Sequence, residues 1–111
     1  MRLPNAQNAV VERRKLTDYL LNAAHPDNGG KAAFFQALGF TGKDWPTLAA
    51  ALHQLAETSV VVKNMESSHG HKYILHGRIR TPSGKTPQVQ TVWIVNRGQD
   101  VPRLVTAYPH E

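Results

Sequence analysis

The hydrophobic pattern of the chain changes its period near Thr58. Before this residue, apolar side chains recur every three or four positions, for example at Leu48, Leu52 and Leu55, which is typical of one face of a helix. After it, apolar and polar residues alternate and β-branched residues replace alanine, which is typical of strands. The sequence therefore predicts a helical first half and a β-sheet in the second half.

Loop-forming residues divide the first half into three expected helices. The segment HPDNGG ends the first one, because proline disfavours helical conformation in the residue before it and glycine tolerates positive φ. Gly39 ends a short second helix, and Asp44 is the expected N-cap of the third, with Pro46 in its first turn. The expected helices cover residues 12–22, 31–38 and 44–57.

Turn-rich segments divide the second half in the same way. The turns SSHGH, TPSGKTP and NRGQDVP are short enough to join antiparallel neighbours. The expected strands cover residues 59–65, 72–80, 88–95 and 103–107. We therefore expect a single α+β domain over residues 1–111, with N-terminal helices packed on one face of a C-terminal four-stranded antiparallel sheet. The other face is left for function.

Composition and motifs exclude several classes of protein. The chain has no Cys, which excludes disulfide scaffolds, thiolate nucleophiles and Cys-based zinc sites. Its apolar runs, such as residues 48–52, are far shorter than the ~20 residues of a membrane-spanning helix, and residues 1–9 lack the apolar core of a secretory signal. The GxSxG, HExxH, GxGxxG and Walker A patterns are missing. Any chemistry is therefore left to His, Lys, Arg, Thr, Tyr or carboxylates.

The net charge of +5 is concentrated in the second half of the chain. Residues 63–111 hold seven Lys or Arg against three acids, a net charge of +4, whereas residues 1–62 hold six against five, a net charge of +1. A basic protein is attracted to polyanions such as nucleic acid. We therefore expect an anion-binding surface mainly on the sheet.

The second expected strand has one basic face. Side chains alternate along a strand, so Tyr73, Leu75, Gly77 and Ile79 point one way, and Lys72, Ile74, His76, Arg78 and Arg80 point the other way. Neighbouring strands could add two polar pairs to this face, namely Thr91 with Trp93 and Thr106 with Tyr108. The alternative is an ordinary solvated strand face.

Two histidines and one lysine are candidates for proton transfer and phosphate binding. Imidazole is suited to proton transfer near neutral pH, which favours His25 in a loop and His76 on the basic strand. Lys31 follows Gly-Gly at a helix start, where backbone N–H groups and a cation can bind a phosphate, although a solvated lysine explains the placement equally well. The other histidines are expected to be a packing residue at His53, a terminal residue at His110, and a pair, His69 and His71, that lacks a third metal ligand.

Nearly the whole chain is covered by the segments LPNAQNAVV, KLTDYLLNAAHPDNGGKAAFFQALGF, TPSGKTPQVQTVWIV and PRLVTAYP. Together these segments resemble a small bacterial family of unknown function associated with polymorphic-toxin and toxin–antitoxin settings. The last segment and the order of the elements are also similar to the toxin nucleases with the barnase/EndoU/colicin/RelE-like fold.

The resemblance implies metal-independent cleavage of RNA by attack of the ribose 2′-hydroxyl on the adjacent phosphate, with no cofactor. It implies catalytic roles for Thr106 and Tyr108 of TAYP, for Thr91 of QTVW, and for His25 and Lys31 of HPDNGGK. The basic strand adds His76 as a catalytic candidate from its own pattern, and the general acid and base stay unassigned. The expected nucleic-acid-binding residues are Lys72, Arg78, Arg80 and Arg103.

The partners that the resemblance implies are RNA, including tRNA, and an acidic immunity or antitoxin protein. The expected location is the bacterial cytoplasm, or the cytoplasm of a target bacterium into which the toxin is delivered.

Two alternative functions stay open. One is a non-catalytic module that binds nucleic acid or an acidic protein through the same basic face, and the other is a structural or interaction domain whose charge keeps it soluble.

Overall fold

The computed structural model describes residues 1–110 and has the expected order of helices and strands. The helical elements are the 3-10 turn η1 (Ala6–Asn8), α1 (Arg13–Lys15), the π-helical turn η2 (Leu16–Leu20), α2 (Lys31–Ala37) and α3 (Trp45–Thr58). The strands are β1 (Val61–Ser67), β2 (Gly70–Arg78), β3 (Gln88–Asn96) and β4 (Arg103–Pro109). The prediction of an α+β fold with helices before the sheet is confirmed.

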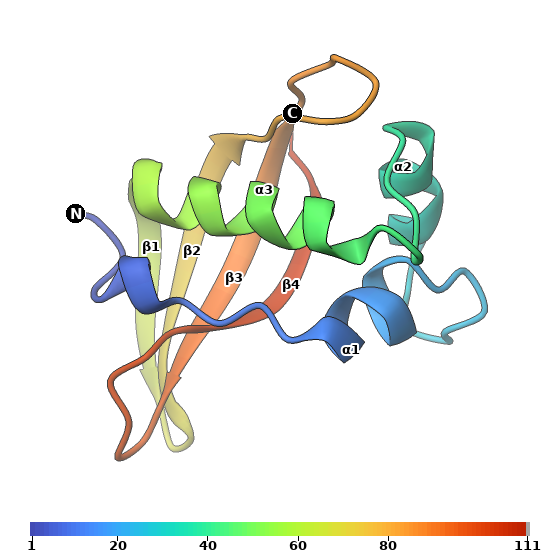
Figure 1. The fold of residues 1–111 in the computed structure, drawn as a ribbon. Helices are drawn as coiled ribbons and strands as arrows, with labels where there is room; N and C mark the ends of the chain where they lie inside the picture. Colours follow the sequence, from blue (N-terminus) through green and yellow to red (C-terminus); the bar gives the residue numbers. More distant parts are fainter. Residues whose placement is uncertain (111) are drawn as a thin grey trace.

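The four strands form one antiparallel meander in the order β1-β2-β3-β4 (Figure 1). Residues in register form rows across the sheet, and members of one row share a face. The row Leu75, Thr91 and Ala107 is fully buried. The next row, His76, Gln90 and Tyr108, is half-buried and lies on the opposite face, which we call the open face.

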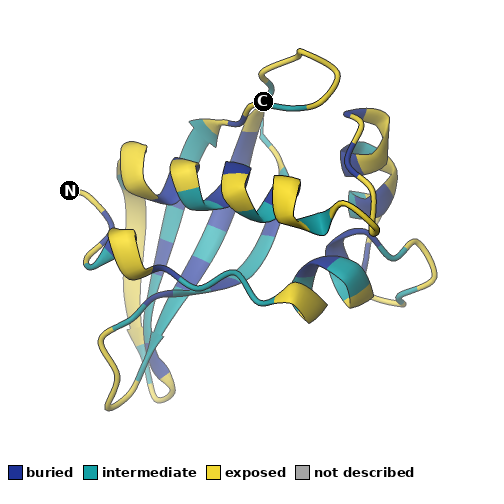
Figure 2. Cartoon of the chain, viewed as in Figure 1, coloured by how far each residue is buried: buried dark blue, intermediate teal, exposed yellow. Residues whose placement is uncertain are grey.

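Helix α3 crosses one face of the sheet, and the core lies between them (Figures 1 and 2). Leu48, Leu52 and Leu55 of α3 are buried in one cluster with Leu75 and Trp93 of the sheet. Figure 2 shows that the outer side of α3 is exposed while the side toward the sheet is buried. The leucine stripe predicted from the sequence therefore faces the sheet.

The N-terminal segment ties the two edges of the sheet together, which the sequence pattern did not predict. Arg2 forms an antiparallel bridge with Val60 beside β1, and Val10 forms a parallel bridge with Arg103 of β4. The segment therefore runs from one edge of the sheet to the other before α1 begins (Figure 1). Single bridges of this kind carry no periodic signal.

Three local predictions differ from the structure. The first helix, expected over 12–22, contains a π-turn in which the amide of Leu21 donates to the carbonyl of Leu16 at 2.8 Å. The second strand starts at Gly70 rather than at Lys72, because the turn before it is only residues 68–69, and it ends at Arg78 rather than at Arg80, where its pairing with Gln88 of β3 ends. Asp44 precedes α3, but its carboxylate accepts a hydrogen bond from the hydroxyl of Thr47 instead of capping backbone amides.

Among the residues that the structure describes, no helix has the length and apolar character needed to span a membrane.

Candidate functional site

A hydrogen-bonded row crosses the open face at His76, Gln90 and Tyr108. The Nε2 of His76 lies 2.7 Å from Oε1 of Gln90, which can only accept, so the imidazole is the donor. The side-chain amide of Gln90 in turn donates to the hydroxyl oxygen of Tyr108. The phenolic proton of Tyr108 is therefore left to donate to another acceptor. The ring of His110 stacks on that of His76 with centroids 3.6 Å apart.

A β-bulge in β4 turns Thr106 onto the open face. Trp93 is in register with Leu104, but its neighbour Val92 is in register with Thr106, so Val105 is an extra residue. Without the bulge, strict alternation from the buried Leu104 would turn Thr106 toward the core. With it, Thr106 and Tyr108 both share the face of His76.

The side chain of Tyr19 in η2 reaches Thr106. The two hydroxyl oxygens lie 3.2 Å apart. The ring of His25 meets the ring of Tyr19 edge-on, with centroids 5.0 Å apart. Tyr19 in η2 therefore places His25 beside Thr106, which lies on the open face in the row next to that of His76, Gln90 and Tyr108.

The ammonium group of Lys31 lies between the two tyrosines. Its Nζ is 5.6 Å from the ring centroid of Tyr19 and 5.8 Å from that of Tyr108, both within the range of cation–π attraction. It also donates to the carbonyl of Asn28 at 3.2 Å. Lys31 thus joins the Thr106 side of the site to the His76 side.

Asn28 holds the loop that carries His25 and Lys31. It is 3% exposed, and both ends of its side-chain amide are bonded. Its Nδ2 donates to the carbonyl of Tyr19 at 2.6 Å, and its Oδ1 accepts from the amide of Ala32 at 2.8 Å. Gly30 follows at φ 86°, a conformation that favours glycine. The NGG sequence therefore fixes η2 against the start of α2.

These side chains form one continuous set of contacts, which we call the polar cluster. Its members are Tyr19, His25, Lys31, His76, Gln90, Thr106, Tyr108 and His110. Beside it is an open depression of about 390 Å³, lined by Lys15, Tyr19, His25, Asp27, Val105 and Thr106. The depression is large enough to receive part of a nucleotide, and it is bordered by one lysine, Lys15, and one acid, Asp27.

One of the expected catalytic residues, Thr91, does not belong to the polar cluster. Thr91 is 0% exposed, lies in the row of Leu75 and Ala107, and accepts a hydrogen bond of 2.8 Å from the indole Nε1 of Trp93. The expectation that Thr91 and Trp93 could join the basic face is wrong, because their register with β2 turns both toward α3. A surface ligand cannot reach Thr91.

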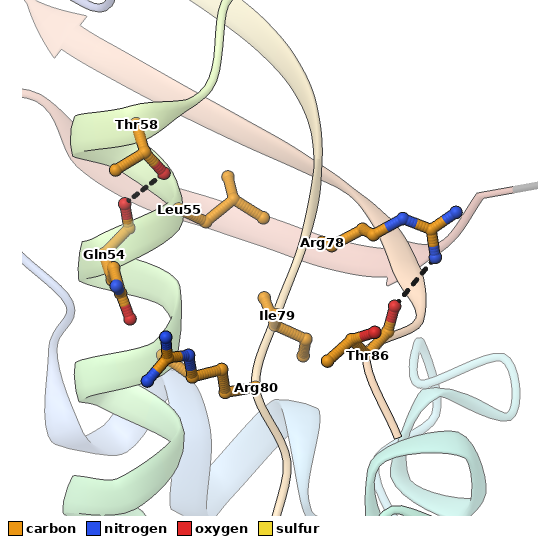
Figure 3. A pocket seen from close by; sticks show the side chains of 8 residues that line it. Gln54, Leu55, Thr58, Arg78, Ile79, Arg80 and Thr86 are labelled. Atoms are coloured by element: carbon orange, nitrogen blue, oxygen red, sulfur yellow. Dashed lines mark hydrogen bonds between the residues drawn. The ribbon is translucent and has the colours of Figure 1, made fainter. Parts of the chain in front are cut away.

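The four expected nucleic-acid-binding residues lie in different surroundings. Lys72 and Arg78 lie on the open face, in the same alternating set as His76. The guanidinium of Arg78 donates to the carbonyl of Thr86 at 2.8 Å. Arg80 lies beyond the end of β2, and Figure 3 shows it extending toward α3 while Arg78 extends away from it. Placing Arg80 on the strand face is therefore wrong. It lines a separate cavity of about 270 Å³.

Arg103 on β4 is in register with Ile94 and has an acidic partner. Its Nη1 lies 3.3 Å from a carboxylate oxygen of Glu12. This ion pair neutralises part of the charge that was expected to bind phosphate.

The His69 and His71 turn lies at the far end of the β1–β2 hairpin, away from the polar cluster. Both ring nitrogens of His71 are engaged, Nδ1 with the carboxylate of Glu66 and Nε2 with Oδ1 of Asn64 at 2.9 Å. Within residues 1–110, no three His, Asp or Glu side chains lie close enough together to hold a metal ion.

Sequence reasoning missed Tyr19, Gln90 and Asn28. Tyr19 falls inside the first expected helix, over residues 12–22, and a π-turn that redirects a side chain is not visible in an apolar pattern. Gln90 is one polar residue of an alternating strand. The NGG signal at Asn28 predicted a turn, and the burial that makes Asn28 the residue that fixes this loop is seen only in the structure.

Comparisons with known proteins address the fold and the family. The chain is similar to a solved structure described as a contact-dependent growth inhibition toxin–immunity protein complex from Klebsiella pneumoniae 342. The similarity has a TM-score of 0.74 at 20% sequence identity, and it covers 92% of this chain and 100% of the matched chain, so the two share a fold. No curated protein matches the chain in sequence. The model of one family matches residues 2–111, and the chain therefore belongs to the family described as Domain of unknown function (DUF6883).

Proposed function

We propose that the polar cluster cleaves RNA without a metal ion. In this reaction the ribose 2′-oxygen bonds to the adjacent phosphorus, and the bond from phosphorus to the 5′-oxygen breaks. The products are a 2′,3′-cyclic phosphate and a 5′-hydroxyl. A base must take the 2′-proton, a donor must protonate the leaving 5′-oxygen, and donors must stabilise the charged phosphorane. The supporting observation is that five side chains expected at the site from the sequence, His25, Lys31, His76, Thr106 and Tyr108, belong to one continuous cluster.

The hydrogen bonds of the two imidazoles decide which ring nitrogen can take or give a proton. His76 donates from Nε2 to Gln90, so the neutral ring has an unprotonated Nδ1 that can accept the 2′-proton. His25 accepts a hydrogen bond of 3.1 Å at Nδ1 from the amide of Asp27, so in the neutral ring its proton is on Nε2. A neutral imidazole is too weak an acid to protonate the leaving oxygen, so the donor in our proposal is the imidazolium form of His25, which gives up the bond from Asp27 and donates from Nε2. His76 is the base that takes the 2′-proton.

Three other members of the polar cluster supply the charge and hydrogen bonds that a phosphorane needs. The ammonium group of Lys31 offsets the developing negative charge. The phenolic proton of Tyr108, which the bond from Gln90 leaves available, points to a non-bridging oxygen. The hydroxyl of Thr106 binds a second oxygen. Lys72 and Arg78 on the same face hold neighbouring phosphates of the RNA.

The chain shares its fold with one chain of a toxin–immunity protein complex, which supports a role in a toxin–immunity setting, and within that setting we propose the toxin role. In this proposal the enzyme acts on RNA in the cytoplasm of a bacterium, either the producing cell or a target into which it is delivered. An acidic immunity or antitoxin protein would neutralise it by covering the open face, because that face carries Lys72, Arg78 and Lys31. The substrate class includes tRNA.

The test is single-turnover cleavage of total bacterial RNA and of purified tRNA by the pure protein. We expect products that end in 2′,3′-cyclic phosphate. The variants His25→Ala, Lys31→Ala and Thr106→Ala should each cleave about 10²-fold more slowly or worse, with RNA affinity little changed, as for loss of a proton-transfer or charge-stabilising group. A folded wild-type protein that retains RNA in a salt-sensitive manner without cutting it would replace the enzyme with the binding module.

A further inference from the structure

Tyr19 contacts three members of the polar cluster, Thr106, His25 and Lys31. Its hydroxyl pairs with Thr106 at 3.2 Å, its ring meets His25, and the ammonium groups of Lys15 and Lys31 each lie 5.6 Å from its centroid. Its backbone carbonyl accepts from the buried Asn28. One side chain therefore contacts a hydroxyl, an imidazole and a cation of the polar cluster, together with Lys15 of the adjoining depression.

The backbone around Tyr19 is irregular at this position. Leu16 and Leu20 in η2 are fully buried, but Tyr19 between them is half-buried and turns toward β4. A π-turn adds one residue to a helical turn, which redirects the side chains within it, and such turns are frequent at functional sites. The bulge at Val105 turns Thr106 onto the open face, and Tyr19 in the π-turn meets its hydroxyl there.

We propose that Tyr19 is a positioning residue for the RNA cleavage proposed above, in that its hydroxyl fixes Thr106 and its ring fixes Lys31 against the same phosphate. Thr106 has a rotatable hydroxyl on an edge strand, and Lys31 has a long flexible side chain, so neither is rigid alone. Tyr19 orients both from one rigid ring. The inference rests on the proposed function and names a residue that works through Thr106 and Lys31.

The variant Tyr19→Phe isolates the hydroxyl, since the ring and its contacts with Lys31 and His25 are kept. We expect kcat to fall about tenfold, because a small misplacement of a reacting group is costly, while KM for RNA stays the same. Thermal unfolding of the variant should match that of the wild type. Tyr73→Phe is the matched control, because it removes a tyrosine hydroxyl from the opposite face of the sheet and should leave kcat unchanged.

A double-variant cycle separates positioning from a general structural role. If Tyr19 acts through Thr106, the pair Tyr19→Phe with Thr106→Val should cleave no more slowly than Thr106→Val alone. Additive losses, or a Tyr19→Phe variant that cleaves at the wild-type rate, would overturn this inference and leave the ribonuclease intact. A wild-type protein that does not cleave RNA would overturn both.

Discussion

The indole nitrogen of Trp93 donates a hydrogen bond of 2.8 Å to the hydroxyl of Thr91, and both side chains are completely buried. Thr91→Val keeps the shape of the side chain but leaves the indole N–H without an acceptor. An unpaired buried donor costs ~1–3 kcal/mol, so we expect the free energy of unfolding to fall by about that amount. Cleavage per folded molecule should not change.

Urea denaturation and single-turnover cleavage measure the two effects separately. Thr86→Val, at an exposed position in the loop before β3, is the matched control and should alter neither. A Thr91→Val protein of unchanged stability that cleaves RNA much more slowly would restore Thr91 to the catalytic site.

Asn28→Ala should loosen the loop that carries His25 and Lys31. It removes the partners of the Tyr19 carbonyl and the Ala32 amide, so we expect a loss of roughly 2–4 kcal/mol in the free energy of unfolding. The control is Asn22→Ala, whose side-chain hydrogen bonds are exposed, with an expected loss below about 1 kcal/mol. Chemical denaturation checks both variants, and equal losses would contradict the role of Asn28.

Gly77→Ala should weaken the contact between α3 and β2. A Cβ at this position would lie 2.1 Å from the hydroxyl oxygen of Ser59 and 3.1 Å from Cγ of Leu55, so the Ser59 side chain would have to rotate and the Leu55 side chain would have to shift. Overpacking of this kind costs ~1–3 kcal/mol. Gly42→Ala meets no atom within 4 Å and should be near neutral in the same thermal-unfolding experiment. Equal melting temperatures for the two variants would argue against close packing at Gly77.

Lys72→Gln should weaken RNA binding and make its salt dependence shallower. A phosphate contact releases a counterion, and its loss lowers the slope of log affinity against log salt by ~0.7 for a single strand. Arg80→Gln tests whether RNA also extends toward the α3 side of the sheet, and the same change in slope is expected. Lys43→Gln, in the loop before α3, is the control. Filter-binding titrations at several salt concentrations measure the slopes. If Lys43→Gln lowers the slope as much as Lys72→Gln does, the RNA is attracted by overall charge rather than by a site on the open face.

Cleavage should not depend on divalent ions. The proposed roles use imidazole, ammonium and hydroxyl groups, which transfer protons and stabilise charge without a metal. We therefore expect excess EDTA to leave the single-turnover rate on RNA unchanged. Activity that disappears with EDTA and returns with Mg²⁺ or Mn²⁺ would contradict the mechanism.

Local sequence was sufficient to predict the helices and strands of this fold. The leucine stripe of α3, the loop signals at HPDNGG and Gly39, and the alternation after Thr58 depend on residues close in the chain, and their predictions agree with the structure to within a few residues. The concentration of positive charge on the second strand also follows from local alternation. His76 was identified in this way, from its own strand alone.

Tertiary structure decided which residues meet at the site. The register of β3 against β2 turned Thr91 into the core, and the single extra residue at Val105 turned Thr106 and Tyr108 out of it. The π-turn in η2 and the buried amide of Asn28 then brought Tyr19, His25 and Lys31 to the same face. Register, bulges and contacts between distant segments depend on packing of the whole chain, since a shift of one residue along a strand reverses every side chain. No local pattern in the sequence determines them.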